Sequence, residues 1–240
     1  MNSKLKIVIG LIYLICLSSL LYYLFSKYDL KDLVDINFLK ENKKIFTGFK
    51  EQNTFLVSVA FFLFSVIWVL LLGFGSIVAI AGGFIFGKWL GALLVITSCT
   101  VGATLLYILG LVFFKDFIEA KLAPRLGKFK TLFNQNETLY FALYRMSGGG
   151  LPFFMQNLLP VIFSMKVKNY FYATLIGLIP AGFILAAIGA GIDKFLIKDS
   201  LDWSGLLSDP DIYLPLVGFV IILIFGIIIK KKFFYEKKNN

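Results

Sequence analysis

The chain has 240 residues, of which 59% are hydrophobic and only 16% are charged, and its mean hydropathy is +0.85. A soluble domain of this length is nearer half apolar, so the composition argues against a soluble enzyme and predicts an all-α integral membrane protein. The sequence contains no histidine, which removes the commonest general base and metal ligand. No nucleophile–base pair, P-loop or metal cluster can be recognised either, so we expect no enzymatic activity, no catalytic or metal-binding residues and no cofactor.

Long uncharged stretches divide the chain into candidate membrane spans. A helix needs about 20 apolar residues to cross a bilayer core. Four stretches fit one crossing each, namely 7–26, 89–114, 169–192 and 212–229. The first is longer than the apolar core of a usual signal peptide, and no small-residue cleavage site follows it. The sequence therefore predicts four transmembrane helices, the first of which is a retained anchor.

The uncharged stretch 52–87 is too long for one crossing and too short for two full crossings with a turn. Glycines at Gly73 and Gly75 weaken a helix there, and Ser76 is a good N-cap for a second piece. That second piece has only about 18 Å of helix, which is too short to cross. The stretch predicts a helical hairpin that enters the membrane and returns.

A second irregular stretch, 146–165, opens with Ser-Gly-Gly-Gly-Leu-Pro from Ser147 and carries Asn157 and Pro160 further on. Three glycines followed by a proline favour a break, with Pro152 in the first turn of a new helix. Irregular backbone at membrane depth is tolerated where protein or a watery cavity surrounds it. We therefore expect a second re-entrant hairpin, with an ordinary loop outside the membrane as the alternative.

Charges in the connectors orient these elements. Lysines near the N-terminus and at 230–238 place both ends in the cytoplasm, and the five aspartates of 193–211 suit the outside. In this topology hairpin 54–87 dips in from outside, hairpin 138–165 dips in from inside, and a crossing follows each hairpin. The arrangement is an inverted repeat in a multi-pass protein of the cell (cytoplasmic) membrane.

Three regions follow from this layout. Residues 1–53 form an N-terminal transmembrane anchor and an interfacial segment, although six lysines in 27–51 conflict with a position outside the cell. Residues 54–192 hold the two hairpin-plus-helix repeats. Residues 193–240 hold the acidic connector, the last transmembrane helix and a basic tail.

The strongest candidate for a functional residue is Arg145, because only two of the 24 basic residues are arginines. Inverted-repeat transporters place their site near the midplane, where the N-termini of half-helices point inward and attract anions. An arginine this close to the membrane interior usually has a function, and its planar fork suits a phosphate. The alternative is an interfacial cation whose charged end reaches the lipid headgroups. The predicted residues of a lipid-phosphate site are Arg145, Gly149, Gly150, Pro152, Asn157 and Ser76.

Motifs in both halves resemble those of the DedA-like superfamily, also called the VTT-domain or SNARE-associated Golgi protein family. The residues that carry the resemblance are Gly83-Phe84-Ile85-Phe86-Gly87, Gly91, Gly102-Ala103, Tyr144-Arg145, Pro152-Phe153, Asn157, Phe171, Thr174, Gly177 and Pro180. The resemblance covers 54–192 and implies two re-entrant hairpins and a lipid-handling role, with Arg145, Pro152 and Asn157 as site residues. The DedA branch has an acidic residue in its first hairpin, whereas 54–87 has none, which puts proton-coupled transport in doubt.

We therefore expect a lipid transporter or scramblase that handles phosphate-bearing lipids, either phospholipids or polyprenyl phosphates. The alternatives are a membrane scaffold that transports nothing and a transporter of a small soluble anion. The expected partners are membrane lipids and no nucleic acid, and formation of a homo-oligomer stays open.

The predicted topology can be tested with single cysteines at Asp202 and Lys237 in a background that lacks Cys16 and Cys99. A membrane-impermeant thiol reagent should label the two positions from opposite sides, because the aspartate-rich connector and the lysine-rich tail are predicted to face different compartments. Labelling of both positions from the same side contradicts the four-crossing topology.

Overall fold

The computed structural model describes three continuous ranges and some single positions, namely 53–122, 133–148 and 150–196, with single residues within 15–26, at 48 and within 210–224. The chain divides into two compact units, 1–57 and 58–240. The described residues are helical or lie in turns and include no strand, which confirms the all-α prediction. The predicted spans 7–26 and 212–229 and both ends of the chain lie outside the continuously described ranges.

The first repeat begins with α3 (Thr54–Leu70), and a tight turn leads into α4 (Gly75–Leu122). The turn depends on Leu72, whose φ of 64° is left-handed, and on Gly73, whose N–H donates to the carbonyl of Trp68 over 2.8 Å. The break expected here is therefore present. Ser76, however, is not an N-cap: the chain completes its reversal before Gly75, so α4 starts there and Ser76 lies exposed in the first turn.

Within α4 the helix is broken at Gly87, which has φ 79° and ψ 173°. A residue with a side chain rarely adopts this left-handed φ. The short arm before Gly87 folds back on the long arm after it, because a Cβ at Gly91 would lie 2.5 Å from the carbonyl oxygen of Gly82. The first repeat is thus two short antiparallel helical pieces followed by a long helix.

The second repeat has the same order of elements. It comprises α6 (Glu137–Met146), α7 (Phe153–Leu158), the 3-10 helix η3 (Leu159–Phe163) and α8 (Val167–Leu196). Pro152 is the N-cap of α7 rather than a residue of its first turn, and Pro160 lies at the start of η3. Proline removes a backbone donor, which accounts for the tightening of the helix at Pro160. The break expected in 146–165 is present.

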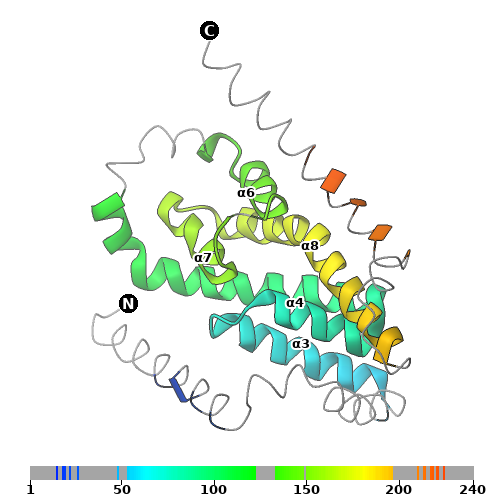
Figure 1. The fold of residues 1–240 in the computed structure, drawn as a ribbon. Coiled ribbons are helices and arrows are strands. Elements are labelled where there is room, and N and C mark those ends of the chain that lie inside the picture. The colour runs from blue at the N-terminus through cyan, green and yellow to red at the C-terminus, as the bar shows by residue number, and fades with distance from the viewer. Residues whose placement is uncertain are drawn as a thin grey trace. The chain divides into compact units, whose positions relative to one another are not determined.

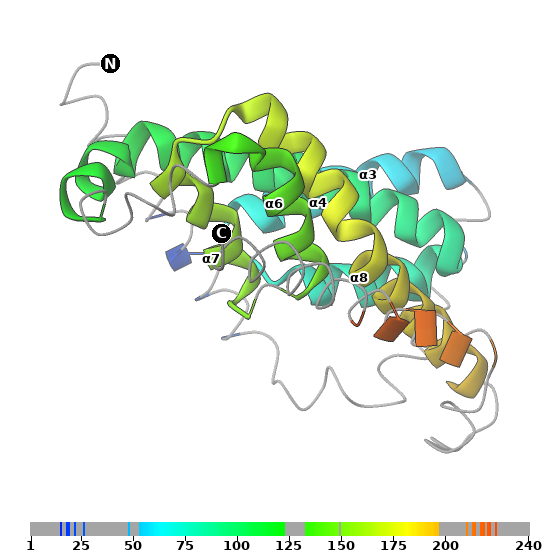
Figure 2. The ribbon, with the colours of Figure 1, turned by 90° about the horizontal axis from the view of Figure 1, so that it is seen from above.

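Each short arm packs on the long helix of the other repeat. A Cβ at Gly83, in the short arm of α4, would overlap the carbonyl oxygen of Ala186 in α8. A Cβ at Gly110, in the long arm of α4, would lie 2.8 Å from the side chain of Leu158 in α7. Figures 1 and 2 show α8 lying along α4, with α6 and α7 beside them. At Gly83 the absence of a side chain lets the two backbones approach closely, and at Gly110 it leaves room for side chains of the second repeat, as is common between membrane helices.

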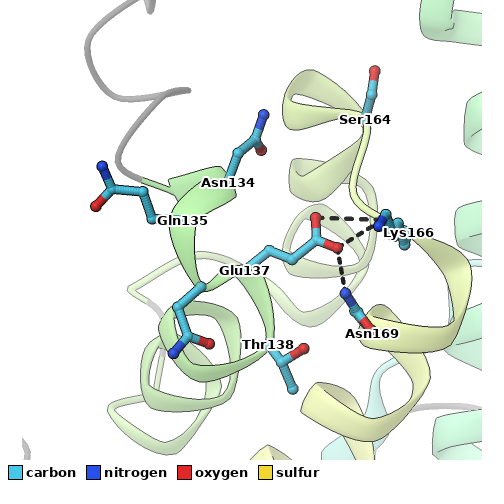
Figure 3. A pocket seen from close by; sticks show the side chains of 8 residues that line it. Asn134, Gln135, Glu137, Thr138, Ser164, Lys166 and Asn169 are labelled. Atoms are coloured by element: carbon cyan, nitrogen blue, oxygen red, sulfur yellow. Dashed lines mark hydrogen bonds between the residues drawn. The ribbon is translucent and has the colours of Figure 1, made fainter.

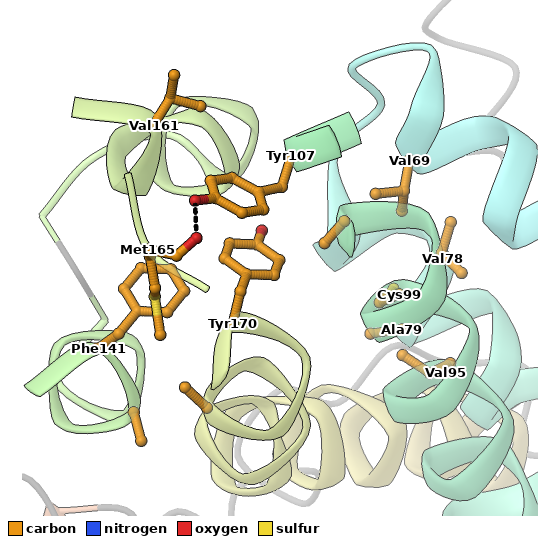
Figure 4. Packing of buried hydrophobic residues seen from close by; sticks show 13 residues of the cluster. Val69, Val78, Ala79, Val95, Cys99, Tyr107, Phe141, Val161, Met165 and Tyr170 are labelled. Atoms are coloured by element: carbon orange, nitrogen blue, oxygen red, sulfur yellow. Dashed lines mark hydrogen bonds between the residues drawn. The ribbon is translucent and has the colours of Figure 1, made fainter. Parts of the chain in front are cut away.

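Two of the described helices are long and apolar enough to cross a membrane, Gly75–Phe113 and Val167–Gly191. The first contains the break at Gly87, and the part after it alone exceeds the roughly 20 residues that a crossing needs. A buried cluster, which includes Tyr107, Phe141 and Tyr170, joins α4, α6 and α8 (Figure 4). Outside that cluster many large apolar side chains are exposed, among them Phe64, Ile67, Trp89, Leu93 and Ile179. Exposed apolar surface on this scale is typical of contact with lipid.

Candidate functional site

Arg145 lies in the last turn of α6 and is only 3% exposed. A long basic side chain at a membrane surface normally extends its charged end into water or headgroups. Here the guanidinium points into the protein instead, so the interpretation of Arg145 as an interfacial cation is wrong for this fold. Burying a charged group is expensive unless polar partners surround it.

Two side chains from other elements hold the guanidinium. Its Nη2 donates to Oδ1 of Asn157 over 2.7 Å and to the hydroxyl of Tyr170 over 2.9 Å. The Tyr170 hydroxyl in turn donates to the backbone carbonyl of Asn157 over 3.3 Å. Asn157 is fully buried in α7 and Tyr170 is fully buried in α8. The network therefore joins α6, α7 and α8 at one point.

Aromatic rings enclose the same guanidinium. The Arg145 Cζ atom lies 4.7 Å from the ring centroid of Phe141, 5.6 Å from that of Tyr170 and 5.7 Å from that of Phe153. The Tyr170 ring also stacks on Tyr107 of α4 at a centroid distance of 4.2 Å (Figure 4). Cations over aromatic faces are stabilised by the ring quadrupole, and more strongly where water is excluded. The rings thus offset part of the cost of burying the charge.

Several polar atoms around Arg145 have no hydrogen-bond partner in the described part of the chain. They are Nε and Nη1 of Arg145, Nδ2 of Asn157, Oγ1 of Thr174 and the Tyr144 hydroxyl. No described carboxylate pairs with Arg145 either. The group therefore carries one uncompensated positive charge and a surplus of donors. Such a set of atoms is suited to an anionic ligand that accepts several hydrogen bonds, such as a phosphate.

The starts of α4 and α7 meet beside this site. A Cβ at Gly75 would lie 3.2 Å from the ring of Phe153, which also covers the guanidinium. On the other side, a Cβ at Gly177 of α8 would lie 2.7 Å from the Cβ of Arg145, so Gly177 leaves the space that Arg145 occupies. The helices that begin after the two predicted breaks therefore start side by side.

The turn between α6 and α7 is held by one side chain. Nε2 of Gln156 donates to the carbonyls of Gly148 and Leu151 over 3.1 and 2.7 Å. Gly148 and Gly150 have left-handed φ values of 77° and 64°, and a Cβ at either would meet open space. The glycines are therefore needed for backbone conformation rather than for close approach. The predicted site residue Gly149 lies outside the described residues.

The predicted site residues are thus brought together in part. Arg145 and Asn157 are in direct contact, and Pro152 caps the helix that carries Asn157. Gly150 lies in the connecting turn, whereas Ser76 is exposed and its neighbour Gly75 makes the contact with Phe153.

Sequence reasoning missed Tyr170 and Gln156. A tyrosine beside lysines at the start of a span is typical of an interfacial belt, so Tyr170 carried no distinguishing signal. Gln156 did carry one, because a carboxamide inside an apolar stretch requires a polar partner. Among the described residues no group of three or more histidine, cysteine, aspartate or glutamate side chains could hold a metal ion.

Comparison with known proteins identifies the family. Residues 74–191 match the VTT domain, so the chain belongs to the VTT-domain, DedA-like family of membrane proteins. It is similar to a protein named Transmembrane protein 41 homolog from Caenorhabditis elegans, with 24% identity over 213 residues, which cover 86% of this chain and 83% of that protein. No solved structure matches the chain. The matched range begins after α3 and runs through most of α8, and it contains all the residues around Arg145.

The Tyr170 hydroxyl should contribute to stability through its contacts with Arg145 and Asn157. In Tyr170→Phe a buried guanidinium nitrogen and a buried carbonyl each lose a partner, so we expect destabilisation by about 1–3 kcal/mol. Tyr172→Phe is the matched control, since Tyr172 lies on the same helix and is 48% exposed. Thermal unfolding of the purified protein in detergent should show a lower melting temperature for the first variant and almost no change for the second. Equal melting temperatures would contradict the network.

Proposed function

We propose that this protein moves phosphate-bearing lipids across the membrane, as a transporter or scramblase, and that Arg145 holds the lipid phosphate during passage. The observation that carries the proposal is a buried guanidinium with Nε and Nη1 unpartnered in the described residues and no carboxylate beside it. A phosphate oxygen supplies what is missing, because Arg–phosphate pairs form charge-assisted, often bidentate hydrogen bonds.

The surroundings of the site favour a lipid over a soluble molecule. The helices expose large apolar side chains, and the VTT-domain family is known generally for lipid-related membrane proteins. In the proposed arrangement four helices cross the membrane, and the two hairpins re-enter it from opposite faces. The starts of α4 and α7, which meet at Phe153, would then lie near the membrane interior. A phosphate at this point would be enclosed by protein rather than by hydrocarbon.

The predicted residues other than Ser76 and Gly149 have a role in this proposal. Arg145 binds the phosphate, and Asn157 positions the guanidinium and offers its own Nδ2 donor. Pro152 starts α7, and Gly150, with its left-handed φ, allows the turn before it. Thr174 offers a further hydroxyl. Since the stretch 52–87 has no carboxylate, we expect movement of lipid that does not need a proton gradient.

Substitution of Arg145 tests the role of the guanidinium. Arg145→Lys keeps the charge but not the planar fork, so it should retain only part of the activity, and Arg145→Ala should lose most of it. Loss of a charge-assisted hydrogen bond of about 1.5–3 kcal/mol corresponds to a rate lower by roughly 10- to 100-fold. The measurement is translocation of labelled phospholipid and polyprenyl phosphate in liposomes, with and without an imposed proton gradient. Arg125→Lys, at the only other arginine, is the control.

Other outcomes identify the alternatives. A wild-type protein that moves neither lipid under either condition favours a membrane scaffold. Uptake of inorganic phosphate without lipid movement favours a transporter of a small soluble anion. Equal activity of the wild-type, Arg145→Lys and Arg145→Ala proteins contradicts the proposed role of the guanidinium. A strict requirement for the gradient contradicts the expected independence from protons and points to a carboxylate such as Glu137 or Asp193.

A further inference from the structure

A second polar feature lies where α6 and α8 begin. It is a cavity of about 360 Å³, and neither Arg145 nor its partners Asn157 and Tyr170 line it. Its volume falls within the range of roughly 300–1,000 Å³ that small-molecule pockets have. The residues that line it are all polar, and its main groups are the carboxamides of Asn134, Gln135, Asn136 and Asn169 with the charged residues Glu137 and Lys166 (Figure 3).

Glu137 is fixed in the wall of this cavity. Its Oε1 accepts from the backbone N–H of Lys166 over 3.2 Å and from Nδ2 of Asn169, and its Oε2 accepts more weakly from the same Lys166 N–H over 3.4 Å (Figure 3). A carboxylate offers about four accepting positions. Glu137 therefore caps the start of α8 and still has an accepting position on Oε2 for an incoming donor.

Lys166 places a positive charge on the same cavity without neutralising Glu137. The exposed Lys166 ammonium group forms no ion pair with Glu137 or with another carboxylate in the ranges that the structure describes. Two opposite charges thus share one cavity while remaining separate. Four carboxamides line the same cavity, and each carries two N–H donors and an accepting oxygen; Asn136 Oδ1 already accepts from the Leu139 N–H and Asn169 Nδ2 already donates to Glu137. This pattern is complementary to a molecule that itself carries one positive and one negative group.

We propose that the cavity binds a phosphate ester that carries a primary ammonium group, as in an ethanolamine-type headgroup. The ammonium donates to Glu137 and to carboxamide oxygens, and the phosphate accepts from Lys166 and from carboxamide N–H groups. The candidate span Val167–Gly191 begins one residue after Lys166, which places the cavity at the level of lipid headgroups. The site is separate from the Arg145 site and requires no lipid movement.

Binding can be measured on the purified full-length chain in detergent micelles by native mass spectrometry. The probes are dihexanoyl phosphatidylethanolamine and dihexanoyl phosphatidylcholine in equal amounts. The two lipids differ in their headgroups, because the trimethylated ammonium of the choline lipid has no N–H to donate to Glu137. Because charge-assisted hydrogen bonds are the stronger ones, we expect the ethanolamine lipid to be retained about tenfold more.

Two variants in the cavity and two control variants assign the binding to the cavity. Glu137→Gln keeps an acceptor for the Lys166 N–H, so the protein should fold while the preference for the ethanolamine lipid is lost. Lys166→Gln should weaken retention of both lipids, whereas Lys168→Gln, at a nearby exposed lysine that does not line the cavity, should leave retention unchanged. Arg145→Ala should also leave the preference unchanged. The melting temperature of each variant shows that it is folded.

Soluble O-phosphoethanolamine shows whether the natural ligand is a lipid headgroup or a free phosphoamine. Competition with the lipid at equal concentration indicates a free phosphoamine as ligand, and failure to compete indicates the lipid headgroup. Equal retention of the ethanolamine and choline lipids would overturn the proposal. So would a loss of preference in Arg145→Ala that Glu137→Gln does not show, because binding would then belong to the Arg145 site.

Discussion

The rest of the site depends on the burial of the Arg145 guanidinium. A charged group placed among apolar side chains must be held by polar or aromatic partners, and each partner here comes from a different part of the chain. Asn157 is supplied by α7 and Tyr170 by α8, and the Tyr170 ring stacks on Tyr107 of α4. Burial of one cation therefore links the second hairpin to the long helices of both repeats. The donors that these partners leave unused are the basis for proposing a phosphate ligand.

Glycine at the helix crossings makes this burial possible. The short arm of α4 meets α8 backbone to backbone at Gly83 and Ala186, and Gly189 of α8 makes a similar contact with the carbonyl of Ile80. Gly177 leaves room for the aliphatic part of Arg145. In a membrane the hydrophobic effect does not drive helices together, so close van der Waals contact of this kind is a main source of their association. Glycines at the helix crossings thus let the helices pack so that Arg145 can be buried between them.

The sequence predicted the helix breaks better than the side-chain contacts around Arg145. The helix break between α6 and α7 has a local cause. Gly148 and Gly150 have left-handed φ values and Pro152 lacks a backbone N–H, and each of these features acts within a few residues. The prediction of Ser76 as an N-cap was wrong for a local reason as well. Leu72 adopts a left-handed φ and completes the turn, so α4 begins at Gly75. Arg145 was recognised because an arginine near the membrane interior is unusual. Its partner Tyr170 lies 25 positions along the chain, and no periodicity reports such a pairing.

The most direct test of the account is the distance between the Arg145 guanidinium and lipid phosphorus. Arginine occurs only at Arg125 and Arg145, so isotope-labelled arginine in an Arg125→Lys protein leaves Arg145 as the single labelled guanidinium. Solid-state NMR of this protein in liposomes measures the dipolar coupling between guanidinium nitrogen and phosphorus. The account predicts a coupling that corresponds to roughly 4 Å, the separation across an N–H···O–P hydrogen bond. A guanidinium with no measurable coupling to phosphorus in the folded protein would contradict it.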